Sequence, residues 1–152
     1  MRHVTLCLLL KDHQVLLAMK KRGFGVGFWN GVGGKVQEGE TIEQAAIRET
    51  QEEIGVTPLS LTKITSVDFI FPEETGWTQT MHVFTVTDWK GQPTESEEMA
   101  PQWFDIDKIP LDQMWESDIQ WMPQILAGKK IKAAFAYDEN QKLQKSEVKE
   151  LN

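Results

Sequence analysis

Three glutamates lie on one side of a predicted helix in the segment GKVQEGETIEQAAIRETQEEIGV, residues 34–56. Successive helical residues are about 100° apart, so Glu49, Glu52 and Glu53 share one sector of the helix surface. Like charges at this spacing repel, and a helix selected only for stability would avoid them. A hard divalent cation such as Mg²⁺ or Mn²⁺ removes the repulsion, because it takes oxygen ligands and bridges carboxylates to phosphates. The spacing therefore predicts a metal site that receives a phosphate group.

The residues around the glutamates define the helix that must position them. Thr41 and Gln44 form a capping-box pattern at its start, and Gly55 suits the left-handed conformation that ends a helix. Arg48 precedes Glu52 by one turn and can hold a carboxylate while leaving another oxygen for metal. Apolar or small residues recur every four positions and predict a buried stripe: Ile42, Ala46, Thr50 and Ile54.

The segment resembles the Nudix box, and the chain is similar to Nudix hydrolases. The matching positions are Gly34, Glu40, Arg48, Glu49, Glu52, Glu53 and Gly55. Thr50 departs from the family pattern, in which this position is usually aliphatic; its γ-methyl group faces the buried side, so we interpret it as a packing variant. The alternative is a solvated, charge-rich helix, which explains the glutamates but leaves the glycines and Arg48 unexplained.

The resemblance implies roles for these residues. Glu49, Glu52 and Glu53 are expected metal ligands, and the carbonyl of Gly34 a further one. Residues 95–99, ESEEM, contain an acidic cluster in which the resemblance singles out Glu98 as another metal ligand or as the group that takes a proton from water. Its neighbour Glu97 is the alternative. The expected catalytic group comprises Glu53, Glu98, Glu52 and Arg48, with Mg²⁺ or Mn²⁺ as cofactor.

Length, charge and composition limit the kinds of protein that this chain can be. The 152 residues, 40% of them apolar, suit a single domain over 1–152. A net charge of −7 argues against binding a nucleic-acid polymer through bulk electrostatics. Cys7 is the only cysteine and lies in an apolar run, so we expect a small core residue. The N-terminal apolar run is too short for a signal peptide or membrane span. We therefore expect a cytoplasmic protein without membrane contact, and a monomer because no exposed apolar stripe is evident.

The remaining sequence predicts mixed strands and two helices. Apolar runs predict strands at 3–10, 14–19, 61–71, 79–88, 101–106, 131–137 and 143–149. A glycine-rich loop is expected at 23–34, and helices at 42–54 and in the segment after Asp118, ending near Gly128. This order fits the α+β Nudix fold that the resemblance implies: an α/β/α sandwich with a central mixed β-sheet.

Four stretches that lie outside or extend beyond the Nudix box indicate which branch of the family the chain resembles. They are KKRGFGVGFWNGVGGKVQEGE (20–40), ESEEM (95–99), PQWFDIDKIP (101–110) and MWESD (114–118). Together they resemble the MutT-type oxidised-purine nucleoside triphosphatases, in particular their vertebrate-like branch. The resemblance implies cleavage of a damaged purine nucleoside triphosphate to monophosphate and pyrophosphate, which keeps the damaged nucleotide out of nucleic acid.

A purine substrate needs aromatic walls and a few polar groups at its edge. The resemblance places eight residues around the base: Thr5, Phe24, Asn30, Phe69, Met81, Met99, Trp115 and Asp118. It places Lys20 near the entrance or the phosphates. An ionised Asp118 can accept from the adjacent N1–H and N2–H of guanine. Each aromatic residue could instead be ordinary core, and we adopt that interpretation for Trp29, Trp103 and Trp121.

One substitution affects base recognition. The branch has two consecutive aspartates that exchange a proton, whereas this chain has Ser117 before Asp118. A serine hydroxyl donates or accepts but carries no charge. The sequence therefore leaves the breadth of base recognition open.

Two other functions remain as alternatives. One is a Nudix hydrolase of another diphosphate-linked substrate, such as a dinucleotide, NADH, ADP-ribose or an RNA cap. The other is a nucleotide-binding module without turnover, although such a module would be expected to have lost box carboxylates. The sequence also does not fix which phosphorus is attacked.

Overall fold

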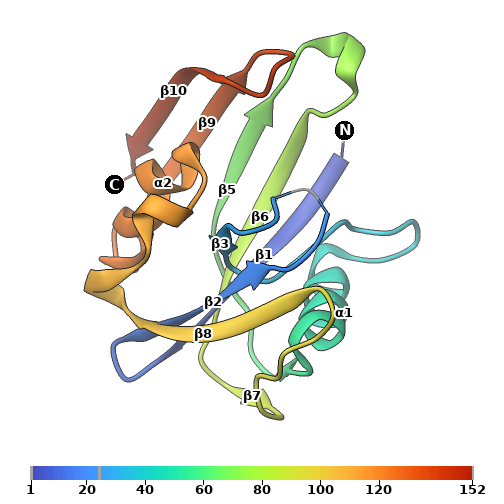
Figure 1. Ribbon diagram of the computed structural model, residues 1–152, viewed down its shortest axis with the longest axis vertical. Coiled ribbons are helices and arrows are strands. Elements are labelled where there is room, and N and C mark those ends of the chain that lie inside the picture. Colours follow the sequence, from blue (N-terminus) through green and yellow to red (C-terminus); the bar gives the residue numbers. More distant parts are fainter. Residues whose placement is uncertain (1, 24, 152) are drawn as a thin grey trace.

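A mixed β-sheet forms the centre of the molecule in a computed structural model that describes residues 2–23 and 25–151 (Figure 1). The strands follow the spatial order β10-β9-β5-β6-β1-β2-β3, and β8 also pairs with β2. Their bounds are β1 Arg2–Lys11, β2 Gln14–Lys20, β3 Trp29–Asn30, β5 Thr62–Ile70, β6 Gln79–Val86, β8 Met99–Asp105, β9 Ile131–Tyr137 and β10 Leu143–Glu150. The pairs β1–β6 and β5–β9 are parallel, and the other named pairs are antiparallel.

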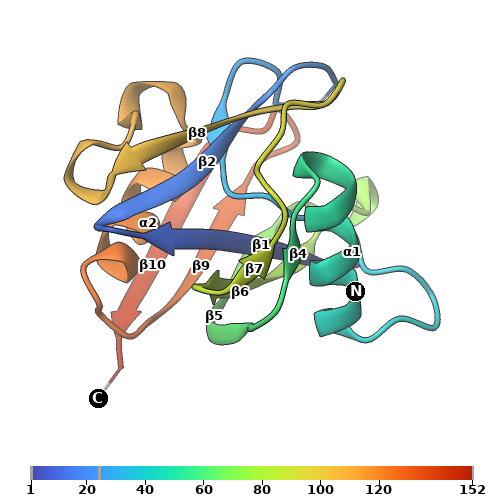
Figure 2. The ribbon, with the colours of Figure 1, turned by 90° about the horizontal axis from the view of Figure 1, so that it is seen from below.

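Two helices cover opposite faces of this sheet (Figure 2). Helix α1 spans Ile42–Ile54, and helix α2 spans Glu116–Leu126. Alternation along β1 sends Leu6 and Leu8 into the core beneath α2, and Cys7 and Leu9 into the core beneath α1. The three layers confirm the predicted α/β/α sandwich, and the buried Cys7 confirms its predicted place in the core.

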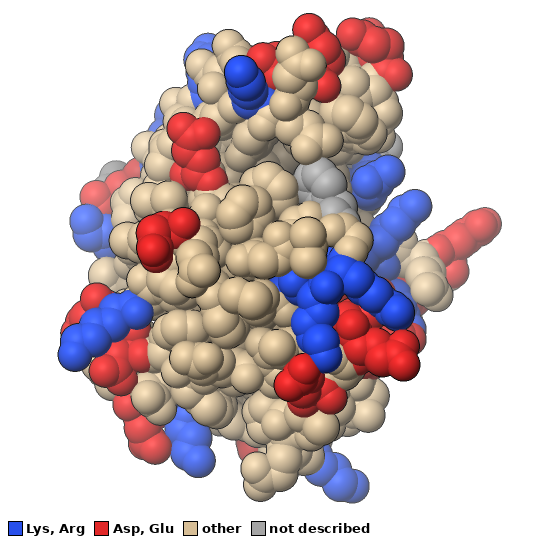
Figure 3. All heavy atoms as spheres, in the orientation of Figure 1, with Lys and Arg blue, Asp and Glu red and all other residues tan. Residues whose placement is uncertain are grey.

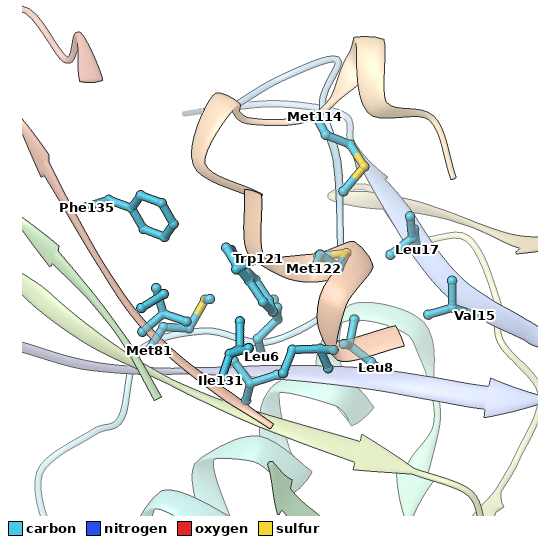
Figure 4. Packing of buried hydrophobic residues seen from close by; sticks show 14 of the residues in the cluster. Leu6, Leu8, Val15, Leu17, Met81, Met114, Trp121, Met122, Ile131 and Phe135 are labelled. Carbon is cyan, nitrogen blue, oxygen red and sulfur yellow. The ribbon is translucent and has the colours of Figure 1, made fainter. Parts of the chain in front are cut away.

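The core beneath α2 is built around Trp121, which is fully buried. Figure 4 shows its ring between helix α2 and the strands, next to Leu6, Met81 and Ile131. Trp29 is also buried and Trp103 is partly buried against the other core. The interpretation of these three tryptophans as core residues is confirmed.

The predicted helix 42–54 is confirmed with both of its ends. Thr41 and Gln44 form the reciprocal capping box, and Gly55 has the left-handed φ of 73° that ends the helix. Thr50 is fully buried, and its hydroxyl donates to the carbonyl of Ala46 at 2.8 Å. This bond satisfies the only polar atom of the side chain, which supports its interpretation as a packing variant.

The prediction for the second helix was wrong at its start. Helix α2 begins at Glu116, so Ser117 and Asp118 lie in its first turn and not in a preceding loop. Acidic residues are favourable there, because the amide groups at a helix N-terminus carry partial positive charge. The predicted strands agree with the structure to within two residues at each end.

The sequence did not predict several short elements. They are β3, the small sheet of β4 Thr57–Pro58 and β7 Trp89–Lys90, and the 3₁₀ turns Glu73–Thr75, Ile106–Lys108 and Leu111–Gln113. Two-residue strands have no periodicity to detect. In the described parts of the chain, no helix has the length and apolarity that crossing a membrane requires.

Two histidines and a lysine lie together on the α1 side of the sheet. The Nε2 atom of His82 lies 3.0 Å from Nδ1 of His3, and its Nδ1 lies 2.9 Å from Nζ of Lys63. Burial, followed by the charges of Lys63 and His3, lowers the pKa of His82, and the smaller effects of Glu43 and Asp68 oppose this shift. The neutral imidazole is therefore the form that fits the fold.

This shift predicts that the stability of the protein falls in mild acid. A histidine with a lowered pKa binds protons more readily in the unfolded chain, so stability is lost as pH falls through about 6.5. The substitution His82→Gln should reduce the slope of unfolding free energy against pH between 7.5 and 5.5, measured by urea denaturation. The exposed His13→Gln is the control. An unchanged slope in His82→Gln would contradict the assignment.

Candidate active site

The loop that follows β3 lies directly against strand β1. The Thr5 N–H donates to the carbonyl of Gly34 at 2.8 Å, and the Cys7 N–H donates to the carbonyl of Val32 at 2.6 Å. A Cβ atom on Gly33 would collide with the backbone carbonyl of Thr5, and one on Gly34 would collide with the Glu49 carboxylate. Glycine is therefore required at Gly33, where the obstacle is backbone, whereas a side chain at position 34 would require the end of Glu49 to move.

Glu53 faces this loop from helix α1. Its Oε1 accepts a hydrogen bond from the Gly33 N–H at 2.9 Å, and the residue is only 8% exposed. Burial raises the pKa of Glu53 to about 7, the Gly33 bond opposes the rise, and the charges of Glu49, Lys20 and Glu98 act from further away. The structure thus brings a buried carboxyl group, two more carboxylates and one lysine into a single region.

Arg48 organises the other carboxylates. Its guanidinium binds both oxygens of Glu40, at 2.7 and 2.9 Å, and Nη1 donates to Glu49 at 2.8 Å and to Glu52 at 3.1 Å. The hydrogen bonds from Arg48, then the backbone bond from Gln37, lower the pKa of Glu40 to about 2. The predicted role of Arg48 in holding a carboxylate is confirmed, with Glu40 as its principal partner.

The donors in this region suit a hard divalent cation, although they do not form a closed cage. Across 2–23 and 25–151, no group of three or more histidine, cysteine or acidic side chains is arranged to hold a metal ion. Arg48 lies between Glu49 and Glu52, and the Gly34 carbonyl accepts bonds from the N–H and hydroxyl of Thr5. Carboxylate and carbonyl oxygens are nevertheless the ligands that Mg²⁺ and Mn²⁺ prefer, so the residues fit such an ion.

Glu98 approaches this region from the segment before β8. Its carboxylate lies 3.4 Å from Arg22, and the neighbouring Glu97 lies 3.5 Å from the same guanidinium. Glu98, but not Glu97, acts on the pKa of Glu53, which favours Glu98 as the residue nearer the site. Figure 3 shows acidic and basic side chains close together beside a broad uncharged surface.

A cavity of about 140 Å³ opens on the α2 face of the sheet. It is lined by Asn30, Phe69, Phe71, Gln79, Met81, Trp115, Ser117, Asp118, Tyr137 and Gln141. Six of these are residues that the sequence placed around a purine: Asn30, Phe69, Met81, Trp115, Ser117 and Asp118. They come from four separate elements, β3, β5, β6 and α2, and from Trp115 directly before α2, so residues distant in the sequence form one pocket.

Three other predicted residues that the structure describes do not line the cavity. Thr5 bonds Gly34 beneath α1, and Met99 is buried in the core on that side. The charge of Lys20 lowers the pKa of Glu53, so Lys20 lies within electrostatic reach of that carboxyl group. Phe24 lies outside the described residues.

Four cavity residues were missed by sequence reasoning. Phe71 and Gln79 follow the two-residue alternation of Phe69 and Met81, and Tyr137 likewise follows Phe135. That alternation was the available signal, since residues two apart on a strand face the same side. Gln141 lies in the β9–β10 turn and offered no comparable pattern.

Asp118 is the chemically distinctive residue of the cavity. Its Oδ1 accepts from the indole N–H of Trp121 at 3.0 Å, whereas its buried Oδ2 has no partner among the described residues. Burial raises the pKa of Asp118 to about 7, although the Trp121 bond opposes the rise. Ser117 is also buried. An unsatisfied buried carboxyl oxygen is costly unless a ligand supplies its partner.

The fold and the box residues together define a Nudix hydrolase. Residues 1–125 match the NUDIX domain, and the chain belongs to that family. Hydrolases of this family depend on divalent metal ions, in agreement with the oxygen donors found here.

The comparisons with particular proteins extend over most of the chain. It is 53% identical to the oxidized purine nucleoside triphosphate hydrolase of Danio rerio over 134 residues, which cover 88% of this chain and 85% of the relative. It is 44% identical to the Mus musculus protein of the same name, with 99% and 96% covered. A mutator MutT protein from Bacillus halodurans superposes with a TM-score of 0.82 at 25% identity, covering 97% of both chains.

The contact between Gly34 and Glu49 generates a prediction. The substitution Gly34→Ala should displace the flexible end of Glu49 and weaken Mn²⁺ binding on the order of 10–100-fold. Unfolding free energy should change by less than about 1.5 kcal/mol, because a side-chain tip can move where backbone cannot. Titration calorimetry with Mn²⁺ and thermal denaturation measure the two effects. Unaltered Mn²⁺ affinity would rule out this role for the contact.

Proposed function

We propose that this protein hydrolyses oxidised purine nucleoside triphosphates to monophosphate and pyrophosphate in a Mg²⁺-dependent reaction. The open, buried Oδ2 of Asp118 is the observation that supports this most directly. It lies in a cavity with aromatic walls, and Asn30 of that cavity precedes by three residues the glycine that binds Glu53. The names of the vertebrate relatives agree with this proposal.

Base recognition follows from the cavity. Trp115 and Phe69 supply aromatic surface, and Asn30 supplies a donor and an acceptor. An ionised Asp118 accepts from the paired N1–H and N2–H groups of a guanine-type base. Ser117 donates to the O6 of the same base without a change in charge. The two residues together favour guanine-type over adenine-type substrates.

The catalytic residues have separable tasks in the proposed reaction. Glu49, Glu52 and Glu53 would hold the divalent cation, with Glu98 and the Gly34 carbonyl as additional donors. The bound cation supplies neutralisation of phosphate charge and a lower pKa for water. Arg48 keeps Glu49 and Glu52 in place, and Lys20 offers a positive charge near Glu53 for the phosphates. Glu53 or Glu98 accepts the proton of the attacking water, and attack at the β-phosphorus releases pyrophosphate.

A nucleotide panel tests the proposal as a whole. The panel would include 8-oxo-dGTP, 2-hydroxy-dATP, unmodified triphosphates, NADH, ADP-ribose and a dinucleoside polyphosphate, each with and without Mg²⁺. We expect fastest turnover of an oxidised purine triphosphate, with pyrophosphate as the released product. Release of orthophosphate with a nucleoside diphosphate would instead place attack at the γ-phosphorus.

Glu53→Gln should lower kcat on the order of 10²–10⁴-fold in saturating Mg²⁺, because an amide is a poor metal ligand and no base. Protein stripped of metal should be equally inactive. The exposed Glu38→Gln is the matched control and should keep full activity. Circular dichroism establishes that each variant is folded. Full turnover by folded Glu53→Gln would eliminate the assigned role.

The pair Ser117 and Asp118 predicts a pH-dependent base preference. Because the pKa of Asp118 is raised to about 7, its ionised form dominates above that pH and its protonated form below. The ratio of kcat/KM for 8-oxo-dGTP over 2-hydroxy-dATP should exceed one at neutral pH and rise from pH 6 to 8.

Two variants sharpen this prediction. Asp118→Asn should cost about 1–3 kcal/mol in kcat/KM for 8-oxo-dGTP, through loss of the paired acceptor. Ser117→Asp should restore activity toward 2-hydroxy-dATP by supplying a second carboxyl group. Equal kcat/KM for the two substrates at neutral pH, or a ratio that is flat with pH, would show this account of the pocket to be wrong.

A further inference from the structure

A second hollow adjoins the base cavity on the same face of the sheet. It has a volume of about 400 Å³ and is lined by Arg2, Phe71, Trp77, Gln79 and Gln141. Phe71, Gln79 and Gln141 also line the base cavity, so the two hollows share walls. The base cavity, at about 140 Å³, lies below the roughly 300–1,000 Å³ of most ligand sites. The second hollow adds room beyond one ring system.

The position of this hollow determines what can enter it. Asn30 lies three residues before Gly33, which binds Glu53, so the backbone keeps Asn30 within about 10 Å of that glycine. Phe71 and Gln141 form the boundary with the second hollow. A base whose triphosphate passes Asn30 toward Glu53 would present its opposite edge to the second hollow. Any group attached to that edge would enter the hollow.

The walls of the hollow favour an aromatic group. Trp77 is 36% exposed and meets Phe71 edge-on, with centroids 5.5 Å apart, and Phe71 stacks on Tyr137 at 5.2 Å. Exposed indole surface over a fixed phenyl ring offers a face for a further ring. Arg2 forms no ion pair with a carboxylate in the described part of the chain, so its charge is available to a π-face or an anion.

We propose that this hollow is a substituent subsite, which accepts a planar aromatic group attached to the 2- or 6-position of a purine. The proposal rests on the proposed function and extends its substrate class to purine triphosphates that carry bulky aryl adducts. Positions 2 and 6 are specified because they flank N1, which Asp118 contacts, and lie away from the sugar-bearing N9. A substituent on N2 keeps the N1–H from which ionised Asp118 accepts. A substituent on O6 removes that N1–H, and Asp118 then donates to N1 from its protonated form. Trp77 provides the stacking surface, and Arg2 selects electron-rich or anionic rings.

Pairs of analogues test the subsite independently of base reading. The kcat/KM of O6-benzyl-dGTP is compared with that of O6-methyl-dGTP, and that of N2-benzyl-dGTP with N2-methyl-dGTP. In the unmodified protein we expect the benzyl compound to equal or exceed the methyl compound at one position or both. Trp77→Ala should lower that benzyl-to-methyl ratio about threefold to tenfold. Trp77→Phe, which keeps a ring, should preserve most of it, and Leu59→Ala on the remote surface should leave it unchanged.

The role of Arg2 has its own comparison. A para-carboxybenzyl substituent should react better than a para-aminomethylbenzyl substituent in the unmodified protein, because a guanidinium attracts the first and repels the second. Arg2→Gln should remove this preference. Persistence of the preference in Arg2→Gln would exclude the assigned role of Arg2.

Failure of the subsite is distinguishable from failure of the proposed function. Turnover of 8-oxo-dGTP tests the function alone. Benzyl analogues that react more than tenfold slower than methyl analogues at both positions, or a ratio unaffected by Trp77→Ala, would overturn the subsite. If 8-oxo-dGTP is not hydrolysed, titration calorimetry with O6-benzyl- and O6-methyl-dGMP applies the same comparison to binding, and weaker binding of the benzyl compound would overturn it.

Discussion

The close approach of the loop after β3 to strand β1 is the constraint on which the rest of the site depends. Gly33 lies so near the Thr5 backbone that it has no room for a side chain, and Gly34 lies against the Glu49 carboxylate. Because the loop reaches this depth, its Gly33 N–H binds the buried carboxyl group of Glu53. The same backbone path places Asn30 in the base cavity. The packing of this loop thus fixes the position of the base cavity relative to the catalytic carboxyl group.

The positive charge of Arg48 offsets the repulsion between the carboxylates on and next to helix α1. Arg48 contacts Glu40, Glu49 and Glu52, and only Glu53 turns away toward the loop. A surface ion pair contributes little to stability, but a guanidinium with several fixed acceptors defines where each carboxylate lies. Helix α1 therefore presents its acidic groups in defined directions before any cation binds.

The sequence predicted the parts of the fold that have strong local rules. Helix α1 and its caps follow from Thr41, Gln44 and Gly55, because capping chemistry is local. The start of α2 did not follow in this way, because Trp115 caps it without a side-chain hydrogen bond. Box residues were assigned by a motif, whereas Phe71, Gln79 and Tyr137 were missed because a pocket wall depends on which strands become neighbours. The parallel pairing of β5 with β9 brings Phe71 and Tyr137 together, and no local pattern encodes it.

The C-terminal hairpin of β9 and β10 lies beyond the residues that match the NUDIX domain. It nevertheless contributes Tyr137 and Gln141 to the walls of the base cavity, whereas the box carboxylates lie on α1. Mutations in this hairpin can alter the shape and polarity of the cavity without disturbing Arg48 or the glycine loop. The residues for hydrolysis and part of the residues for substrate recognition thus lie in separate segments. Substrate preference can therefore evolve through changes in the hairpin while the hydrolytic residues stay the same.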